Sequence, residues 1–171
     1  MVTDDQLSEL VARVARWALG GKYHLVTAES CTGGWIAKVF TDVAGSSRWF
    51  EGGYVTYSNE AKVRDLGVSQ RTLEEHGAVS EATVREMARG ALRVTGAEVS
   101  IAVSGIAGPD GGSAEKPVGT VWFCVGRRSG AAPSEIELVT AGGLFGGNRE
   151  AVRRASVQRA LELVLQFEAR S

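Results

Sequence analysis

Residues 23–40, YHLVTAESCTGGWIAKVF, combine a β-prone run, a glycine turn and an amphipathic segment. The run 23–28 is rich in residues that favour strands. After the glycines, apolar side chains recur at helical spacing at Trp35, Ile36, Val39, Phe40 and Val43. We expect this helix to begin just after Ser30, with residues 32–34 in its first turn. Strand, glycine turn and helix in this order form the basic unit of α/β folds.

The rest of the chain continues this alternation of helical and strand patterns. Helices are expected over 4–19, with Thr3 as N-cap, and over 58–66, 69–75, 80–95 and from 148 onward. Strands are expected over 53–57, 99–103, 118–125 and 136–140. The last two strands predict an antiparallel hairpin, so the sheet should be mixed. We therefore predict a three-layer α/β/α sandwich with a mixed β-sheet, as one domain over 1–171.

The composition is that of an ordinary globular chain and excludes several classes of protein. Among 171 residues, 44% are hydrophobic, and 19 Lys and Arg oppose 20 Asp and Glu. The net charge of −1 predicts neither general nucleic-acid binding nor a membrane-surface partner. There is no apolar run of membrane-spanning length and no basic secretory leader, which favours a cytoplasmic protein. Two cysteines and the absence of ligand-type spacing predict no metal, and we expect no cofactor.

Three glycine-rich segments, 29–34, 104–113 and 142–147, follow expected strands. Ligands of open α/β sheets gather at such strand ends, where glycine lets backbone N–H groups approach an anion. Each segment taken alone is more readily explained as a tight turn. Together they favour a small molecule that carries a phosphate or a carboxylate. None matches a P-loop or a dinucleotide-binding fingerprint.

Ser30 is either the N-cap of the following helix, the commoner role, or a nucleophile beside backbone donors. The backbone N–H groups of residues 31–33 would then stabilise an oxyanion. Neither histidine of the chain, His24 or His76, has a compelling acidic partner. Lys62 replaces histidine as a base if burial keeps its amine neutral, although most lysines are solvated surface charges.

Two neighbours of Ser30 have open roles. Cys31 is either a rival nucleophile, favoured by a helix N-terminus, or a small buried hydrophobe. Glu29 is either an acid or orienting carboxylate for Lys62, or a structural residue at the strand end. These alternatives stay open on the residues alone.

Several sequence runs together resemble the CinA C-terminal domain family. They are AESCTGG (28–34), YVTYSNEAK (54–62), HGAVS (76–80), SGIAGPDGG (104–112), KPVGTV (116–121) and GGNR (146–149). The resemblance covers nearly the whole chain. It implies a nicotinamide-nucleotide amidohydrolase of the stand-alone form, whose partner is a nucleotide, nicotinamide mononucleotide, hydrolysed to the nicotinate nucleotide and ammonia.

Carried over by motif, the resemblance implies a role for each candidate residue. Ser30 is the nucleophile, Lys62 its general base and Tyr57 a hydrogen-bonding assistant, with an oxyanion site at the backbone of Cys31, Thr32 and Gly33. The substrate-binding set is Gly34, Gly105, Ala107, Gly108 and Arg149, of which Arg149 holds the phosphate. A homodimer is plausible for such an enzyme. The alternative is a non-catalytic nucleotide-binding or regulatory module with the same glycine loops.

Overall fold

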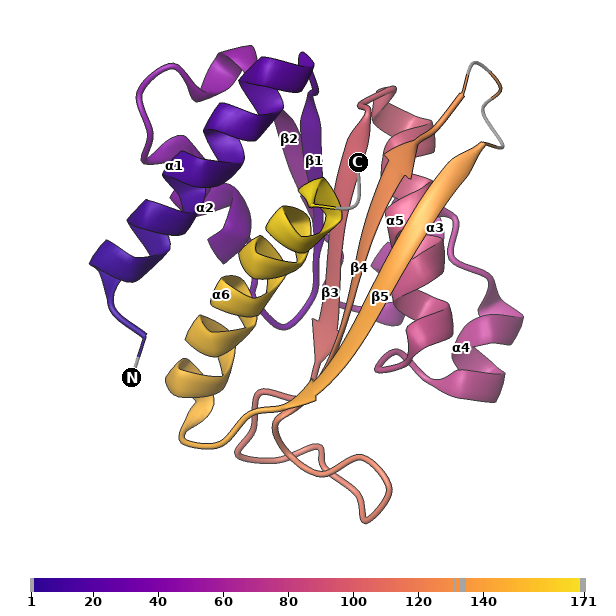
Figure 1. Cartoon of the computed structure of the whole chain (residues 1–171). Coiled ribbons are helices and arrows are strands. Elements are labelled where there is room, and N and C mark those ends of the chain that lie inside the picture. The colour runs from indigo at the N-terminus through magenta and orange to yellow at the C-terminus, as the bar shows by residue number, and fades with distance from the viewer. Residues whose placement is uncertain (1, 131, 133–134, 170–171) are drawn as a thin grey trace.

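In the computed structural model, which describes residues 2–130, 132 and 135–169, helices cover both faces of a five-stranded sheet (Figure 1). The chain runs through α1 (Asp4–Gly21), β1 (Leu25–Glu29), α2 (Trp35–Thr41), the 3-10 helix η1 (Ser46–Arg48), β2 (Phe50–Val55), α3 (Asn59–Leu66), α4 (Gln70–His76), α5 (Glu81–Thr95), β3 (Val99–Gly105), β4 (Thr120–Arg128), β5 (Ile136–Leu144) and α6 (Arg149–Glu168). The predicted α/β/α sandwich is confirmed.

The sheet is mixed and has the strand order β2-β1-β3-β4-β5. Strand β1 pairs in parallel with β2 and β3, whereas β4 pairs antiparallel with β3 and β5, which confirms the predicted hairpin. Strand β5 therefore runs in the same direction as β1 and β3. The carboxyl ends of these three strands lie at one edge of the sheet, the lower edge in Figure 1, and the three glycine-rich segments meet there.

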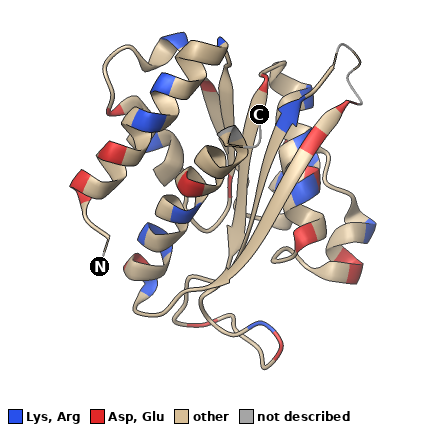
Figure 2. Cartoon of the chain, viewed as in Figure 1, with Lys and Arg blue, Asp and Glu red and all other residues tan. Residues whose placement is uncertain are grey.

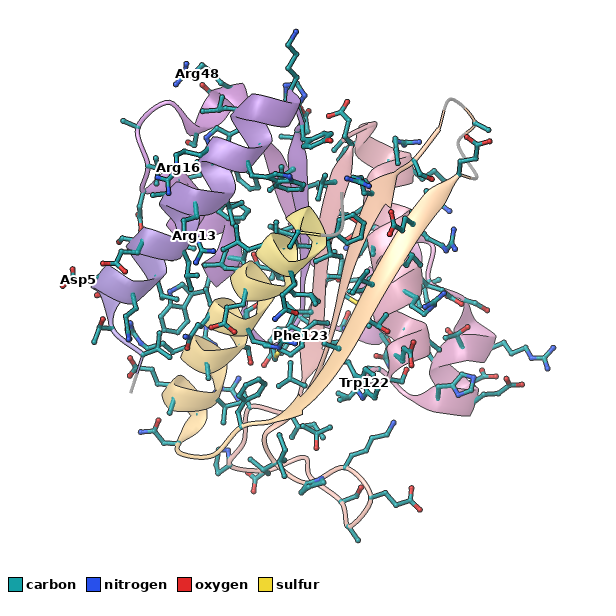
Figure 3. All side chains as sticks on the ribbon, in the orientation of Figure 1. Asp5, Arg13, Arg16, Arg48, Trp122 and Phe123 are labelled. Atoms are coloured by element: carbon teal, nitrogen blue, oxygen red, sulfur yellow. The ribbon has the colours of Figure 1, made fainter. Side chains whose placement is uncertain are left out.

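Two apolar cores lie on opposite faces of the sheet. Helices α1, α2 and α6 pack on one face, and α3, α4 and α5 on the other. Adjacent strand residues alternate between these cores, as the pleat requires. Figure 3 shows this for β4, where Phe123 joins the core beneath α6 and Trp122 packs toward α5. The edge at which the three glycine-rich segments meet is thus supported from both sides.

The strand boundaries differ from expectation where glycine pairs within the sheet. The second strand was expected over 53–57 but lies at 50–55, because Gly52 and Gly53 pair with β1. A Cβ atom on Gly53 would lie 2.6 Å from Thr27 Oγ1, so this pairing needs glycine. Likewise β5 continues through two glycines of the segment 142–147, and the expected corner begins only after Leu144.

The charged residues show no division into an acidic and a basic face in the view of Figure 2. Lysine, arginine, aspartate and glutamate are interspersed over the helices. The described part of the chain contains no helix that is long and apolar enough to cross a membrane.

Candidate active site

The candidate nucleophile Ser30 lies directly after β1 and is held by the neighbouring strand. Its backbone N–H donates to the carbonyl of Val103 on β3 (3.0 Å), and only 8% of the residue is exposed. The helix expected directly after Ser30 begins only at Trp35. Gly33 and Gly34 have φ of +62° and +92°, a left-handed conformation that a right-handed helix excludes. The expectation that residues 32–34 form the first helical turn was therefore wrong.

Glu29, not Ser30, caps helix α2. Its carboxylate accepts hydrogen bonds from the backbone N–H groups of Gly34 (3.1 Å), Ile36 (3.0 Å) and Ala37 (2.8 Å). It also accepts the hydroxyl of Thr32 at 2.7 Å. The positive end of α2 is thus already occupied by a negative charge. The hydrogen bonds of the Glu29 carboxylate to described residues all run to this turn and helix and none reaches Lys62, which favours the structural role.

Lys62 reaches Ser30 from the other face of the sheet. It lies on α3, which begins where the Ser58 hydroxyl accepts the Ala61 N–H (3.1 Å). Only 1% of Lys62 is exposed. Its Nζ lies 3.0 Å from Ser30 Oγ and within hydrogen-bonding distance of two carbonyl oxygens, those of Thr56 (2.8 Å) and Tyr57 (3.2 Å). Two side chains that are 32 residues apart in sequence therefore meet.

The surroundings of Lys62 make the uncharged amine easier to reach than in a solvent-exposed lysine, although the ammonium still predominates at neutral pH. Burial lowers the pKa of Lys62 from 10.5 to about 8. A neutral amine has two hydrogens and one lone pair. When its hydrogens are donated to the two carbonyl oxygens, which only accept, the lone pair is left for the Ser30 hydroxyl. This is the orientation that a general base requires.

Two backbone donors beside Ser30 are free. Within the described residues, the N–H groups of Cys31 and Thr32 have no hydrogen-bond acceptor. The third donor expected there, the Gly33 N–H, donates to the Ser30 carbonyl at 3.0 Å and closes the turn. Buried backbone donors are nearly always paired, so two unpaired ones next to a buried serine are candidates for an oxyanion site. Cys31 lines the pocket over Ser30, whereas Thr32 is fully buried and does not line it.

The rival nucleophile and the rival bases do not have the required environment. Cys31 is 4% exposed, and burial raises the pKa of its thiol to about 12, which disfavours the thiolate. Contrary to expectation, each histidine has an acidic neighbour, Glu98 beside His24 (3.3 Å) and Glu75 beside His76, but neither histidine hydrogen-bonds to Ser30 among the described residues. Among the described side chains, Lys62 is the one that hydrogen-bonds to Ser30 Oγ.

A pocket of about 190 Å³ opens over the Ser30–Lys62 pair. Its lining residues come from the sheet edge, the surrounding turns and the first turns of α3 and α6: Ser30, Cys31, Tyr57, Lys62, Ala78, Val79, Ser104, Gly105, Ala107 and Arg149. Of the predicted binding set, Gly105, Ala107 and Arg149 lie here, and Gly108 adjoins through its carbonyl. Gly34 instead borders a neighbouring hollow, and its N–H is held by Glu29.

Arg149 forms one wall of this pocket. It is the first residue of α6, after the N-cap Asn148, and donates from Nη1 to the Gly108 carbonyl (2.6 Å). Its Nη2 donates to the Tyr57 hydroxyl at 2.9 Å. No described carboxylate lies within ion-pair distance of it, so its positive charge is not neutralised. The Tyr57 hydroxyl thus points to Arg149, whereas Tyr57 contacts Lys62 through its backbone carbonyl.

The sequence analysis did not identify two residues of this region. Ser104 on β3 is 1% exposed, lines the pocket, and its hydroxyl has no described partner. Its place on the strand was visible, but an unpaired hydroxyl requires coordinates. Arg153 on α6 donates to the carbonyls of the turn after Ser30, and no sequence pattern indicated this.

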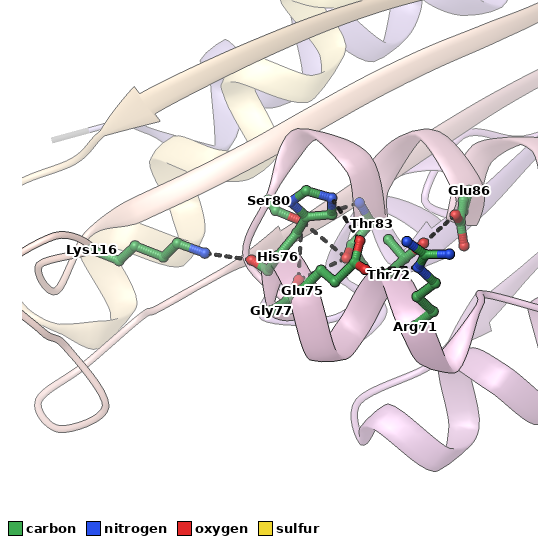
Figure 4. A network of polar contacts seen from close by, with 9 residues as sticks. All are labelled: Arg71, Thr72, Glu75, His76, Gly77, Ser80, Thr83, Glu86 and Lys116. Carbon is green, nitrogen blue, oxygen red and sulfur yellow. Dashed lines mark hydrogen bonds and ion pairs between the residues drawn. The ribbon is translucent and has the colours of Figure 1, made fainter.

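The pocket rim joins two loops that are distant in sequence. Lys116, in the connection 106–119, donates from Nζ to the His76 carbonyl at 2.6 Å (Figure 4). Next to it, the hydroxyls of Ser80 and Thr83 donate to the Gly77 carbonyl (3.0 and 2.7 Å). These contacts hold the turn that contributes two lining residues. The described residues contain no cluster of three or more His, Cys, Asp and Glu side chains suited to a metal ion.

Comparison with known proteins places this geometry in one family. The family model of the CinA C-terminal domain matches residues 7–167. The nicotinamide-nucleotide amidohydrolase PncC of Escherichia coli strain K12 is 52% identical over 165 residues, 96% of each chain. The Pseudomonas putida protein of that name is 48% identical over 95% of this chain and 98% of its own. The crystal structure of the competence/damage inducible protein CihA from Agrobacterium tumefaciens matches with a TM-score of 0.91 and 40% identity, covering 98% of this chain and 99% of that one. The chain therefore belongs to the CinA C-terminal domain family.

Proposed function

We propose that the chain is a nicotinamide-nucleotide amidohydrolase, which converts nicotinamide mononucleotide and water to nicotinate mononucleotide and ammonia. The observation that carries the proposal is the 3.0 Å contact between Lys62 Nζ and Ser30 Oγ in the pocket. The names of the relatives from Escherichia coli and Pseudomonas putida support the choice of substrate.

The first step is attack of Ser30 Oγ on the carboxamide carbon. Neutral Lys62 takes the hydroxyl proton as the C–O bond forms, and the carbonyl electron pair moves onto oxygen. The N–H groups of Cys31 and Thr32, free in the structure, stabilise this oxyanion. The pyridinium ring of the substrate withdraws electrons and makes the carbonyl more reactive.

The second step expels ammonia and leaves an ester. The ammonium of Lys62 returns its proton to the amide nitrogen, and the C–N bond breaks as the carbonyl reforms. Ser30 then carries the nicotinoyl group as an acyl-enzyme. Water, deprotonated by the same amine, attacks the ester and releases the nicotinate nucleotide, and the proton returns to Ser30 Oγ.

Different residues of the pocket bind the pyridine ring and the phosphate of the substrate. The pyridine ring and its carboxamide occupy the pocket over Ser30, where Ser104 Oγ has no described partner and can hydrogen-bond to a polar group of the substrate. The phosphate lies against Arg149, whose guanidinium has no carboxylate partner among the described residues and offers two donors in a planar fork. The Tyr57 hydroxyl supports Arg149 in this position.

The direct test is to incubate the purified chain with nicotinamide mononucleotide and to measure ammonia and the nucleotide product. We expect equal amounts of both, and none from a Ser30→Ala variant that still binds the substrate. Binding without ammonia release by the unaltered chain would instead favour the non-catalytic module. The homodimer and the cytoplasmic location stay predictions.

A further inference from the structure

Arg153 lies behind the nucleophile loop, residues 30–34, on the face of the sheet opposite Lys62. It belongs to the N-terminal half of α6, residues 149–158, which carries three arginines and one glutamate. Its guanidinium donates from Nε to the Cys31 carbonyl (3.1 Å) and from Nη2 to the Thr32 carbonyl (2.8 Å). It also lies over the Trp35 ring, 5.2 Å from the centroid. The guanidinium is therefore fixed by two hydrogen bonds and by an aromatic face.

The first hydrogen bond determines the direction of one free donor. In a trans peptide unit the carbonyl and the N–H point in opposite directions, so a group that holds the carbonyl also orients the N–H. The Cys31 carbonyl shares its peptide unit with the Thr32 N–H, which has no described acceptor. Arg153 Nε thus orients the Thr32 N–H directly.

The second hydrogen bond reaches the other free donor through one more peptide unit. The Thr32 carbonyl, held by Arg153 Nη2, shares its unit with the Gly33 N–H. The Gly33 N–H donates to the Ser30 carbonyl (3.0 Å). The Ser30 carbonyl belongs to the same peptide unit as the free Cys31 N–H. Hydrogen bonds in such a chain polarise one another. The Arg153 guanidinium therefore lies at the start of both series of hydrogen bonds, and it polarises both the Thr32 N–H and the Cys31 N–H.

We infer that Arg153 is the positioning residue of the oxyanion site: it fixes and polarises the backbone donors of Cys31 and Thr32. The inference rests on the proposed function, because these donors matter to the rate only if Ser30 attacks a carbonyl. Arg153 itself does not line the pocket over Ser30, so it acts through the loop and not on the substrate.

Arg154 provides a matched control on the same helix. Its guanidinium also lies over Trp35, 4.9 Å from the ring centroid. It forms ion pairs with Asp4 and, at 3.5 Å, with Glu150, and its described hydrogen bonds do not reach the nucleophile loop. An Arg154→Met variant loses a stacked cation from α6 and leaves the peptide units of the loop as they are.

The experiment compares Arg153→Met, Arg153→Lys and Arg154→Met in two assays. One assay follows ammonia from nicotinamide mononucleotide, and the other follows acylation of Ser30 by p-nitrophenyl acetate, with Ser30→Ala as the blank. We expect Arg153→Met to lower kcat by about 10- to 100-fold with KM within about threefold, because loss of one oxyanion donor typically costs 10²–10³. Acylation by the ester should fall in parallel, and Arg153→Lys, with one point charge, should recover only part of the rate.

The outcomes separate this inference from the proposed function. If the unaltered chain acylates with the ester but releases no ammonia, the proposed function fails and the ester assay still tests Arg153. If Arg153→Met keeps both rates within about threefold, or loses no more than Arg154→Met does, the positioning role is overturned. Thermal unfolding of all variants shows whether a lost rate reflects a lost fold.

Discussion

Two glycine-rich loops meet at the same edge of the sheet but are held in different ways. The nucleophile loop, residues 30–34, is fixed from beneath by Glu29 and from behind by Arg153. The pocket loop, residues 106–119, is exposed over 109–115 and is tied to other elements by the side chains of Lys116 and Arg149. Hydrogen bonds to two charged side chains thus hold the first loop, whereas one exposed and one part-buried contact hold the second.

This difference suggests a division of labour. In the proposed reaction the free donors of the nucleophile loop act on the transition state, so changes around Ser30 should lower kcat. The pocket loop is held by contacts to other elements and forms part of the wall proposed to contact the substrate. Changes around Lys116 and Arg149 should therefore raise KM with little effect on kcat. The predictions below test whether the two loops can be separated in this manner.

The largest effect is expected at Ser30, the proposed nucleophile. Ser30→Ala should lower kcat by about 10⁴-fold or more, because no acyl-enzyme can form. Cys31→Ala, one residue along the same loop, should stay within about threefold of the unaltered chain. Ammonia release measured side by side decides the assignment. Loss of activity in the cysteine variant alone would reverse it.

The second largest effect on kcat is expected at Lys62, the proposed base. Lys62→Met keeps much of the stem volume but removes the amine, and general-base catalysis is typically worth about 10²–10⁴ in rate. We expect a loss in this range in kcat and little change in the affinity for nicotinamide mononucleotide, measured by calorimetry. A variant that keeps more than about a tenth of the rate would exclude Lys62 as the base.

A smaller effect, on KM and not on kcat, is expected at Arg149 in the pocket wall. Arg149→Met removes the guanidinium that hydrogen-bonds to Gly108 and Tyr57 and, in the proposed complex, to the phosphate. Loss of a charge-assisted contact of about 1.5–3 kcal/mol should raise KM by about 10- to 100-fold. Steady-state kinetics should show kcat within about fivefold. A fall in kcat with unchanged KM would remove the distinction between the loops.

The smallest effect is expected at the rim. Lys116→Met loses the contact to the His76 carbonyl and loosens the pocket loop against the 76–80 turn (Figure 4). Because this contact is exposed, we expect KM to rise by only about two- to fivefold. Arg71→Met, which removes an exposed pair with Glu75, is the control and should leave KM unchanged. Equal effects of the two variants would mean that Lys116 does not hold the loop.

The sequence predicted those features that depend on local pattern. Helical spacing and β-prone runs located most elements, and the two adjacent strands before α6 predicted the mixed sheet. Lys62 was one candidate base for Ser30 from the residues alone, and the family resemblance favoured it. The structure gives the pairing a physical basis in burial and two carbonyl acceptors. Boundaries failed where glycine adopts strand or left-handed geometry, since either is compatible with a turn.

Contacts between distant segments could not be read from the sequence. Glu29 caps α2 only because the left-handed turn at Gly33 and Gly34 places the helix end over the carboxylate. Arg153 reaches the Cys31 carbonyl across 122 residues of sequence. Such contacts depend on how the layers pack, which no local periodicity encodes.

The central claim is that Lys62 must be uncharged to take the proton of Ser30. Its most direct test is the rate of a single turnover of nicotinamide mononucleotide between pH 6.5 and 9.5. Because burial lowers the pKa of Lys62 to about 8, the ammonium predominates below that pH and the rate should rise about tenfold per unit. Above it the amine is free and the rate should level off. A rate that is constant or falls across this range would contradict the role of Lys62.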